Sequence, residues 1–203
     1  IPCENLLEPL LDKLPYQLTN AQLRVLSEIQ KDLQGPYIMQ RLIQGDVGSG
    51  KTIIAFLAMY LVSSSGCQSA IMAPTEVLAA QHYETFSQYC ELFGIKAHLV
   101  LLTGSMTAKQ KRRAYERMQL FSDAMIIGTH ALFQEKAVYD SLAFCVFTRF
   151  YKRADDICLM ACGSLPPDKF VSIWTPASAH YTVFDWKTSG RHFIYDGYIQ
   201  IAV

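Results

Sequence analysis

The sequence predicts an α/β fold, a three-layer domain in which helices cover both faces of a mostly parallel sheet. Two observations predict it. Short apolar segments typical of strands alternate with helical segments of ten or more residues, and a glycine-rich loop at residues 45–52 joins one such strand to a helix. Strands that alternate with helices of this length pair in parallel and bury both faces of their sheet.

The elements are expected in a simple order. Residues 1–13 form an amphipathic N-terminal segment. Thr19 is a suitable N-cap for the first long helix, and Gly35 and Pro36 end it. Apolar patterns then predict strands at 41–44, 69–73, 97–102, 124–128 and 142–147, and helices at 51–63, 76–93 and 106–121.

The glycine-rich loop reads Gly-Asp-Val-Gly-Ser-Gly-Lys-Thr, which fits the phosphate-binding pattern G-x-x-x-x-G-K-[ST]. Glycines let backbone N–H groups surround phosphate oxygens, and the following helix presents its positive end to the anion. Lys51 is expected to reach the β- and γ-phosphates, and the Thr52 hydroxyl to bind Mg²⁺. The predicted nucleotide-binding residues of the loop are Gly45, Asp46, Val47, Gly48, Ser49, Gly50, Lys51 and Thr52.

A chance match in a glycine-rich turn is the alternative to this interpretation. The apolar strand before the loop and the apolar helix after it are the context that supports a true phosphate-binding loop. The motif indicates a P-loop NTPase and leaves kinases, GTPases and motors open. A kinase would also need an arginine-rich lid and an acceptor pocket, and the segments described next do not support one.

Three further segments follow predicted strands. They read Ala-Pro-Thr-Glu-Val-Leu-Ala-Ala-Gln-His at residues 73–82, Leu-Thr-Gly-Ser at 102–105, and Ile-Ile-Gly-Thr-His-Ala-Leu at 126–132. They place hydroxyls, small residues and backbone N–H groups at the carboxyl edge of the sheet, where ligands bind in open α/β folds. A row of such groups suits a nucleic-acid backbone, because most protein contacts to nucleic acids are made to phosphate and sugar.

With the loop and these segments, the chain resembles superfamily 2 helicases, and most closely the RecG-type DNA helicases, over residues 14–143. The resemblance implies a RecA-like, ATP-binding motor lobe at residues 14–147 that needs ATP and Mg²⁺. It also implies a bacterial, cytoplasmic protein that acts on forked or branched DNA in repair and recombination, with no membrane association, and we expect a monomer.

The resemblance also assigns residues by position. Gln22 is similar to the glutamine that reads the adenine edge, with Tyr16 as a stacking partner; the alternative for Gln22 is an ordinary exposed helix residue. His130 could instead be a loop histidine that bonds to a backbone carbonyl. The residues expected to contact DNA are Pro74, Thr75, Glu76, Gly104, Ser105, Thr129 and His130.

The resemblance stops near residue 143. The family pattern places Asp-Glu-x-His after the strand that begins near Leu142, and here the residues that follow are Thr148-Arg149-Phe150-Tyr151. Residues 144–203 contain no Glu, both tryptophans and half of the aromatic residues. We therefore expect a truncated lobe followed by a divergent, aromatic-rich tail at 148–203, which a reading-frame change or a lineage-specific replacement would explain.

These departures affect the expected function. Without the Asp that holds the Mg²⁺ shell and the Glu that positions water, the lobe is expected to be catalytically incomplete. The alternative is a non-catalytic nucleotide- or DNA-binding module derived from such a helicase. The formal net charge is zero, and the 6 cysteines are irregularly spaced, which favours reduced thiols over a disulfide framework or a zinc site.

Overall fold

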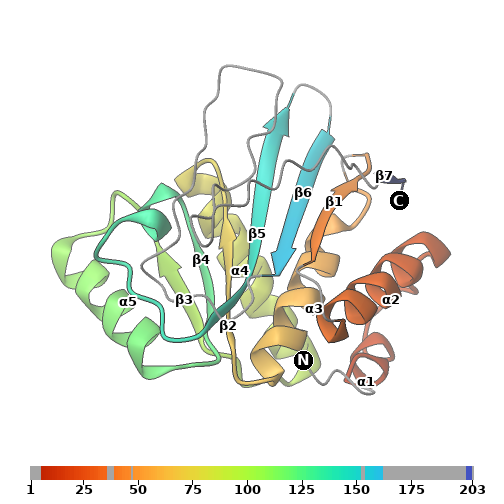
Figure 1. Cartoon of the computed structure of the whole chain (residues 1–203), viewed down its shortest axis with the longest axis horizontal. Coiled ribbons are helices and arrows are strands. Elements are labelled where there is room, and N and C mark those ends of the chain that lie inside the picture. The colour runs from red at the N-terminus through yellow and green to blue at the C-terminus, as the bar shows by residue number, and fades with distance from the viewer. Residues whose placement is uncertain (1–5, 36–38, 47, 152–153, 162–199, 203) are drawn as a thin grey trace, which may run out of the picture.

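The computed structural model describes residues 6–35, 39–46, 48–151, 154–161 and 200–202. Within them, helices lie on both faces of one seven-stranded sheet with the strand order β3-β4-β2-β5-β6-β1-β7 (Figure 1). The strands are β1 (Gln40–Gln44), β2 (Gln68–Met72), β3 (Leu99–Leu102), β4 (Met125–Gly128), β5 (Leu142–Tyr151), β6 (Ala154–Ala161) and β7 (Gln200–Ala202). The helices are α1 (Glu8–Leu11), α2 (Asn20–Gln34), α3 (Lys51–Ser64), α4 (Glu76–Phe93), α5 (Ala108–Leu120) and the 3₁₀ helix η1 (His130–Phe133).

The sheet is mostly parallel, as predicted. Strands β3, β4, β2 and β5 form a continuous parallel block, and β1 pairs in parallel with β7. The departure is β6, which runs antiparallel to both β5 and β1. The predicted α/β fold is therefore confirmed, with one antiparallel strand that separates β1 from the parallel block.

Alternation along the strands builds a core on each side of the sheet. Ile71 of β2 and Val146 of β5 pack with α1 to α4, whereas Met72 and Cys145, one position away, pack with α5 and η1. Successive strand residues point to opposite faces, so β2 and this part of β5 are buried on both sides of the sheet. The result is a three-layer arrangement in which most of α3 is buried in the first core.

Local capping sets the helix ends. Thr19 and Gln22 form a capping box at the start of α2, and the Thr75 side chain accepts a hydrogen bond from the Leu78 N–H at the start of α4. Gly94 ends α4 in the left-handed conformation, with φ of 66°. A glycine adopts this conformation without the steric cost that a Cβ would add.

Both ends of the predicted lobe continue into structure. Leu7 and Leu10 of the N-terminal segment are buried in the first core, and Lys13 Nζ donates to the Phe93 carbonyl at the end of α4 over 2.6 Å. At the other end, β5 runs past residue 147 to Tyr151 and continues the sheet into β6. The domain boundaries at 14 and 147 stay predictions, and most of the tail, residues 162–199, lies outside the described residues.

Candidate nucleotide-binding site

The glycine-rich loop connects β1 to α3, as the sequence predicts. Gly48 and Gly50 have φ angles of 83° and 78°, which favour glycine. Gly50 also has no room for a side chain, because a Cβ there would lie 2.5 Å from the Nε2 atom of Gln22. The loop conformation therefore depends on this glycine for two separate reasons. Val47 lies outside the described residues.

Lys51 turns back into the loop. Its side chain is 5% exposed, and Nζ donates hydrogen bonds to the carbonyl oxygens of Gly45 and Asp46 over 2.9 and 2.8 Å. A third contact, 3.2 Å long, reaches Ser49 Oγ. The ammonium group thus lies on the inner side of the loop, where its donors can serve a phosphate. Thr52, the next residue, is partly buried in the first turn of α3.

Gln22 links helix α2 to the loop. Its side chain is 7% exposed, so the alternative of an ordinary exposed helix residue does not hold. Oε1 accepts from the Thr19 N–H over 2.8 Å, and Nε2 donates to the Ser49 carbonyl oxygen over 2.7 Å. One side chain therefore completes the helix cap and contacts the phosphate-binding loop.

Tyr16 is half-exposed, with 48% of its surface accessible. The pKa of Tyr89 on α4 is raised to about 12, first by burial and then by interaction with the Tyr16 side chain, including a hydrogen bond. This contact places the Tyr16 side chain against α4. Its role as a stacking partner for adenine stays a prediction.

The three segments that we expect to contact nucleic acid follow the ends of neighbouring strands. Met72 of β2 and Leu102 of β3 both pair with Gly128 of β4, so the residues that follow them leave the sheet at one edge. Gly128 brings the strands close together, because a Cβ there would lie 2.1 Å from the Leu102 carbonyl oxygen. The edge thereby gathers Pro74, Thr75, Glu76, Gly104, Ser105, Thr129 and His130, and their contacts with DNA stay predictions.

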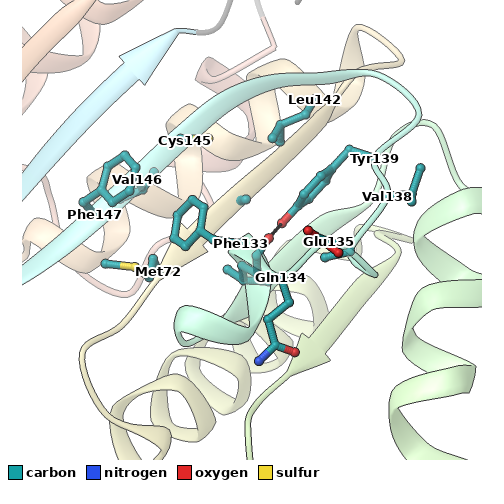
Figure 2. Close-up of a pocket in the computed structure, with 13 residues that line it drawn as sticks. Met72, Phe133, Gln134, Glu135, Val138, Tyr139, Leu142, Cys145, Val146 and Phe147 are labelled. Carbon is teal, nitrogen blue, oxygen red and sulfur yellow. Dashed lines mark hydrogen bonds between the residues drawn. The ribbon is translucent and has the colours of Figure 1, made fainter. Parts of the chain in front are cut away.

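A hollow of about 430 Å³ lies on the sheet face that α5 and η1 partly cover, and it reaches the strand ends at Met72 and Phe147 (Figure 2). Its lining is mostly apolar and includes Met72, Phe133, Tyr139, Cys145 and Phe147. The Tyr139 hydroxyl is not free to bind a ligand, since it donates to the Leu132 carbonyl over 2.8 Å. The hollow contains none of the loop residues, so its size does not make it the nucleotide site.

Comparison with known proteins identifies the family. The DEAD/DEAH box helicase model matches residues 19–147. The chain belongs to the DEAD/DEAH box helicase family. This helicase domain is 44% identical to the ATP-dependent DNA helicase RecG of Aquifex aeolicus over 143 residues, which are 70% of this chain and 18% of that protein. Identity to RecG of Staphylococcus epidermidis is also 44%, over 70% of this chain and 20% of the relative.

Solved structures agree with this assignment. A RecG structure bound to a three-way DNA junction matches 67% of this chain and 18% of that chain, with a TM-score of 0.61 and 40% identity. The helicase MrfA matches with a TM-score of 0.55 at 16% identity, over 72% of this chain and 24% of the other, which supports the fold alone. The predicted resemblance to the first RecG motor lobe and its RecA-like fold is confirmed, and the chain spans about a fifth of the length of its RecG relatives.

The end of β5 does not carry the Asp and Glu that the family pattern led us to expect there. Thr148 stands where the pattern has its metal-holding Asp, and its hydroxyl donates to the Met72 carbonyl over 3.2 Å. Among the described residues, no three His, Cys, Asp or Glu side chains form a potential metal cluster. The hairpin of β5 and β6 pairs the backbone of Arg149 with Asp156 and that of Phe150 with Asp155.

This hairpin brings an acidic pair toward the loop in a way that sequence spacing did not reveal. Ile157, the residue after Asp156, pairs with Ile43 of β1, two residues before the glycine-rich loop begins. Asp155 lies seven residues beyond Thr148 in the sequence, with Asp156 next to it. The antiparallel return of β6 nevertheless brings the backbone of both residues to the same edge. The missed signal was the apolar run after Asp156, which is typical of a strand.

Proposed function

We propose that this chain is the ATP-binding lobe of a RecG-like DNA helicase, a motor that couples ATP hydrolysis to remodelling of forked or branched DNA in repair and recombination. We further propose that the chain by itself is catalytically incomplete. The observation that carries the proposal is the position of the buried Lys51 ammonium group, which donates to carbonyl oxygens inside the glycine-rich loop. Gln22 stabilises this loop through its hydrogen bond to the Ser49 carbonyl.

ATP fits the groups that the loop presents. Lys51 would exchange its contacts with the Gly45 and Asp46 carbonyls for phosphate oxygens, which bind an ammonium group more strongly because they are charged. The N-terminus of α3 adds its positive end to the same anion. Thr52 would present its hydroxyl to Mg²⁺, which neutralises the phosphate charge when it is bound.

Nucleic acid would follow the edge formed by the ends of β2, β3 and β4. The hydroxyl groups and backbone N–H groups there suit phosphate and sugar, and they do not read bases. Because the formal net charge of the chain is zero, general attraction to DNA is small. We expect weak, sequence-independent binding that falls steeply with salt.

Turnover would be limited by the end of β5. Thr148 and Arg149 replace the Asp and Glu that hold the metal and position the attacking water in the family pattern. Loss of a water-positioning group typically lowers the rate by about 10²–10⁴-fold. A chain of this kind would bind ATP without hydrolysing it at a helicase rate.

The experiment measures ATP hydrolysis by the full chain with and without forked DNA, beside a matched measurement of DNA binding. We expect no DNA-stimulated turnover above that of Lys51→Ala. His130→Ala should weaken binding to a labelled fork several-fold, whereas His98→Ala should not, because His98 precedes β3 at the opposite edge of the sheet.

Three results would contradict the proposal. Robust turnover that needs Lys51 would show that the lobe is complete and would point to Asp155 or Asp156 as the metal-holding residue. Sequence-selective DNA binding, or binding insensitive to salt, would argue against a motor lobe. ATP binding with no DNA binding under any salt would favour the alternative, a non-catalytic nucleotide-binding module.

The family context extends the proposal to location and assembly. The similar RecG proteins are bacterial. We therefore expect this chain to belong to a bacterial cytoplasmic protein that works as a monomer. In the part of the chain that the structure describes, no helix has the length and apolar character of a membrane span.

A further inference from the structure

The Glu76 carboxylate points into a turn of the proposed DNA-binding edge. Its Oε1 atom accepts a hydrogen bond from the Ser105 N–H over 2.7 Å. The neighbouring Gly104 approaches closely, since a Cβ on it would lie 3.1 Å from the same oxygen. On the other side of the turn, Lys111 Nζ donates to the Gly104 carbonyl over 2.6 Å.

The turn acts on Glu76 as an anion-binding group. The pKa of the Glu76 carboxyl is lowered, first by a hydrogen bond with the Ser105 side chain and then by the Ser105 N–H. Smaller contributions come from the Gly104 N–H and from the positive charge of Lys111. Successive backbone N–H groups with a hydroxyl and a nearby cation are the donors that bind phosphates elsewhere in proteins.

The location makes this contact unexpected. Glu76 is in the first turn of α4, where Thr75 already supplies the helix cap through its contact with the Leu78 N–H over 3.3 Å. The helix therefore does not need the Glu76 side chain as a cap. A negative charge at this edge also repels the phosphates that the edge is proposed to bind. Both points indicate that the role of the Glu76 carboxylate is to bind the Gly104–Ser105 turn.

We propose that Glu76 is an internal substitute for a DNA phosphate: it occupies the Gly104–Ser105 turn in the free chain, and single-stranded DNA binds the turn by displacing it. This inference rests on the proposed function of the edge. Displacement breaks the direct link between α4 and the turn, so DNA binding would change how these two segments are held together.

The Glu76 carboxylate lowers the affinity of the native chain for DNA, because a DNA phosphate must compete with it for the Gly104–Ser105 turn. Removal of Glu76 should therefore strengthen binding. The contact is exposed, and exposed charge contacts are usually weak, so we expect a gain of roughly twofold to fivefold. A residue that merely shaped the turn would have the opposite effect when removed.

The experiment compares the full chain with Glu76→Ala, Glu76→Gln and Glu84→Ala, using a labelled single-stranded oligo(dT). Glu84 is the matched control, because it is an exposed glutamate on the same helix and its removal changes the net charge equally. Fluorescence anisotropy at fixed salt should give tighter binding for both Glu76 variants and no change beyond the common charge effect for Glu84→Ala. Thermal unfolding checks that each variant is folded.

Hydrogen exchange at the Ser105 amide tests displacement directly. Wild-type chain should protect this amide with or without DNA, whereas Glu76→Ala should lose protection and regain it when DNA is added. Weaker or equal DNA binding by folded Glu76→Ala relative to Glu84→Ala would overturn the inference, as would failure of DNA to restore protection. If no variant, including wild type, binds DNA, the proposed function of the edge fails and this inference fails with it.

Discussion

The side-chain Nε2 atom of Gln22 lies 2.7 Å from the carbonyl oxygen of Ser49, 27 residues further along the chain. An amide side chain can make four hydrogen bonds, two as donor and two as acceptor. Gln22 uses one donor on Ser49 and one acceptor on the Thr19 N–H. These two contacts leave one donor and one acceptor position of the amide unused, and we expect that pair to bind the N7 and N6 groups of adenine.

Replacement of Gln22 by alanine should accordingly reduce both affinity and base preference. We expect the difference in binding free energy between ATP and GTP to narrow by about 1–2 kcal/mol, the value of one or two lost hydrogen bonds. Titration with fluorescent ATP and GTP analogues measures it, and Gln34→Ala, an exposed position on the same helix, is the control. An equal loss for both nucleotides would mean that Gln22 only positions the loop.

Gly50 and Gly66 allow backbone strain to be separated from the steric collision that an added Cβ causes. Both have positive φ, 78° and 77°, so alanine at either position strains the backbone by about 1 kcal/mol. A Cβ at Gly66 meets nothing within 4 Å, whereas one at Gly50 would collide with Gln22 Nε2. Gly50→Ala should weaken ATP binding about tenfold, equivalent to one lost hydrogen bond. Gly66→Ala should leave it unchanged, and equal affinities for the two variants would contradict this explanation.

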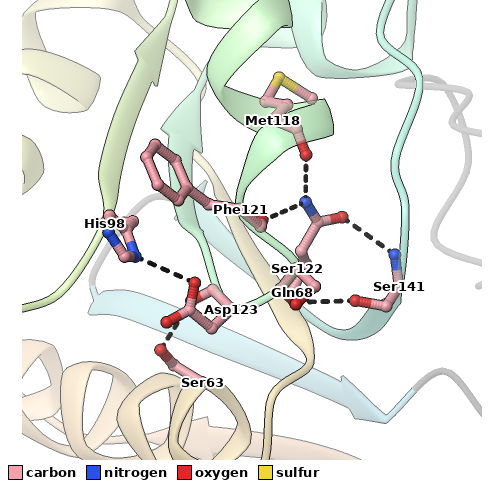
Figure 3. Close-up of polar contacts among 8 residues, drawn as sticks. All are labelled: Ser63, Gln68, His98, Met118, Phe121, Ser122, Asp123 and Ser141. Carbon is pink, nitrogen blue, oxygen red and sulfur yellow. Dashed lines mark hydrogen bonds and ion pairs between the residues drawn. The ribbon is translucent and has the colours of Figure 1, made fainter.

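Gln68 organises the opposite edge of the sheet (Figure 3). Its fully buried side chain donates to the carbonyls of Met118 and Phe121 and accepts from the N–H groups of Asp140 and Ser141. One amide therefore joins the end of α5 to the segment before β5. Such a contact stabilises the fold and lies far from the glycine-rich loop.

Gln68→Ala should lower the free energy of unfolding by about 2–4 kcal/mol, because it leaves several polar groups unpaired and a cavity in their place. Urea denaturation measures the change, with Gln119→Ala, an exposed position on α5, as control. ATP affinity of the folded variant should match wild type. A change of less than about 0.5 kcal/mol, the range of an ordinary surface substitution, would show that water replaces the amide.

The parts of the fold that local sequence determines were predicted well. The expected helix at 76–93 coincides with α4, because the Thr75 cap and the left-handed Gly94 are both local signals. The loop at 45–52 was likewise recognisable, since its residues are contiguous. The antiparallel strand β6 was not predicted, because its pairing with β5 and β1 depends on the tertiary structure. In addition, no Asn-Gly or Asp-Gly turn, the local signal of a hairpin, precedes it.

The same distinction applies to the site. Sequence placed Gln22 and Glu76 near the expected ligands through resemblance, but it did not show that Gln22 is buried against Ser49 or that Glu76 faces Ser105. Both contacts join residues that are 27 and 29 positions apart, and no local pattern encodes them. The chemistry of each motif could be predicted from the sequence, whereas the hydrogen-bond partners of its side chains could be identified only from the three-dimensional structure.

Nucleotide binding through Lys51 is the central property that we propose for this chain. The decisive measurement is a titration of the full chain with a fluorescent ATP analogue in Mg²⁺, for wild type and for Lys51→Ala, with Lys96→Ala as an exposed-lysine control. We predict saturable binding by wild type and Lys96→Ala, and loss of most binding in Lys51→Ala while the fold is retained. Equal ATP affinity for wild type and Lys51→Ala would contradict the assignment of the loop, and with it the proposed function.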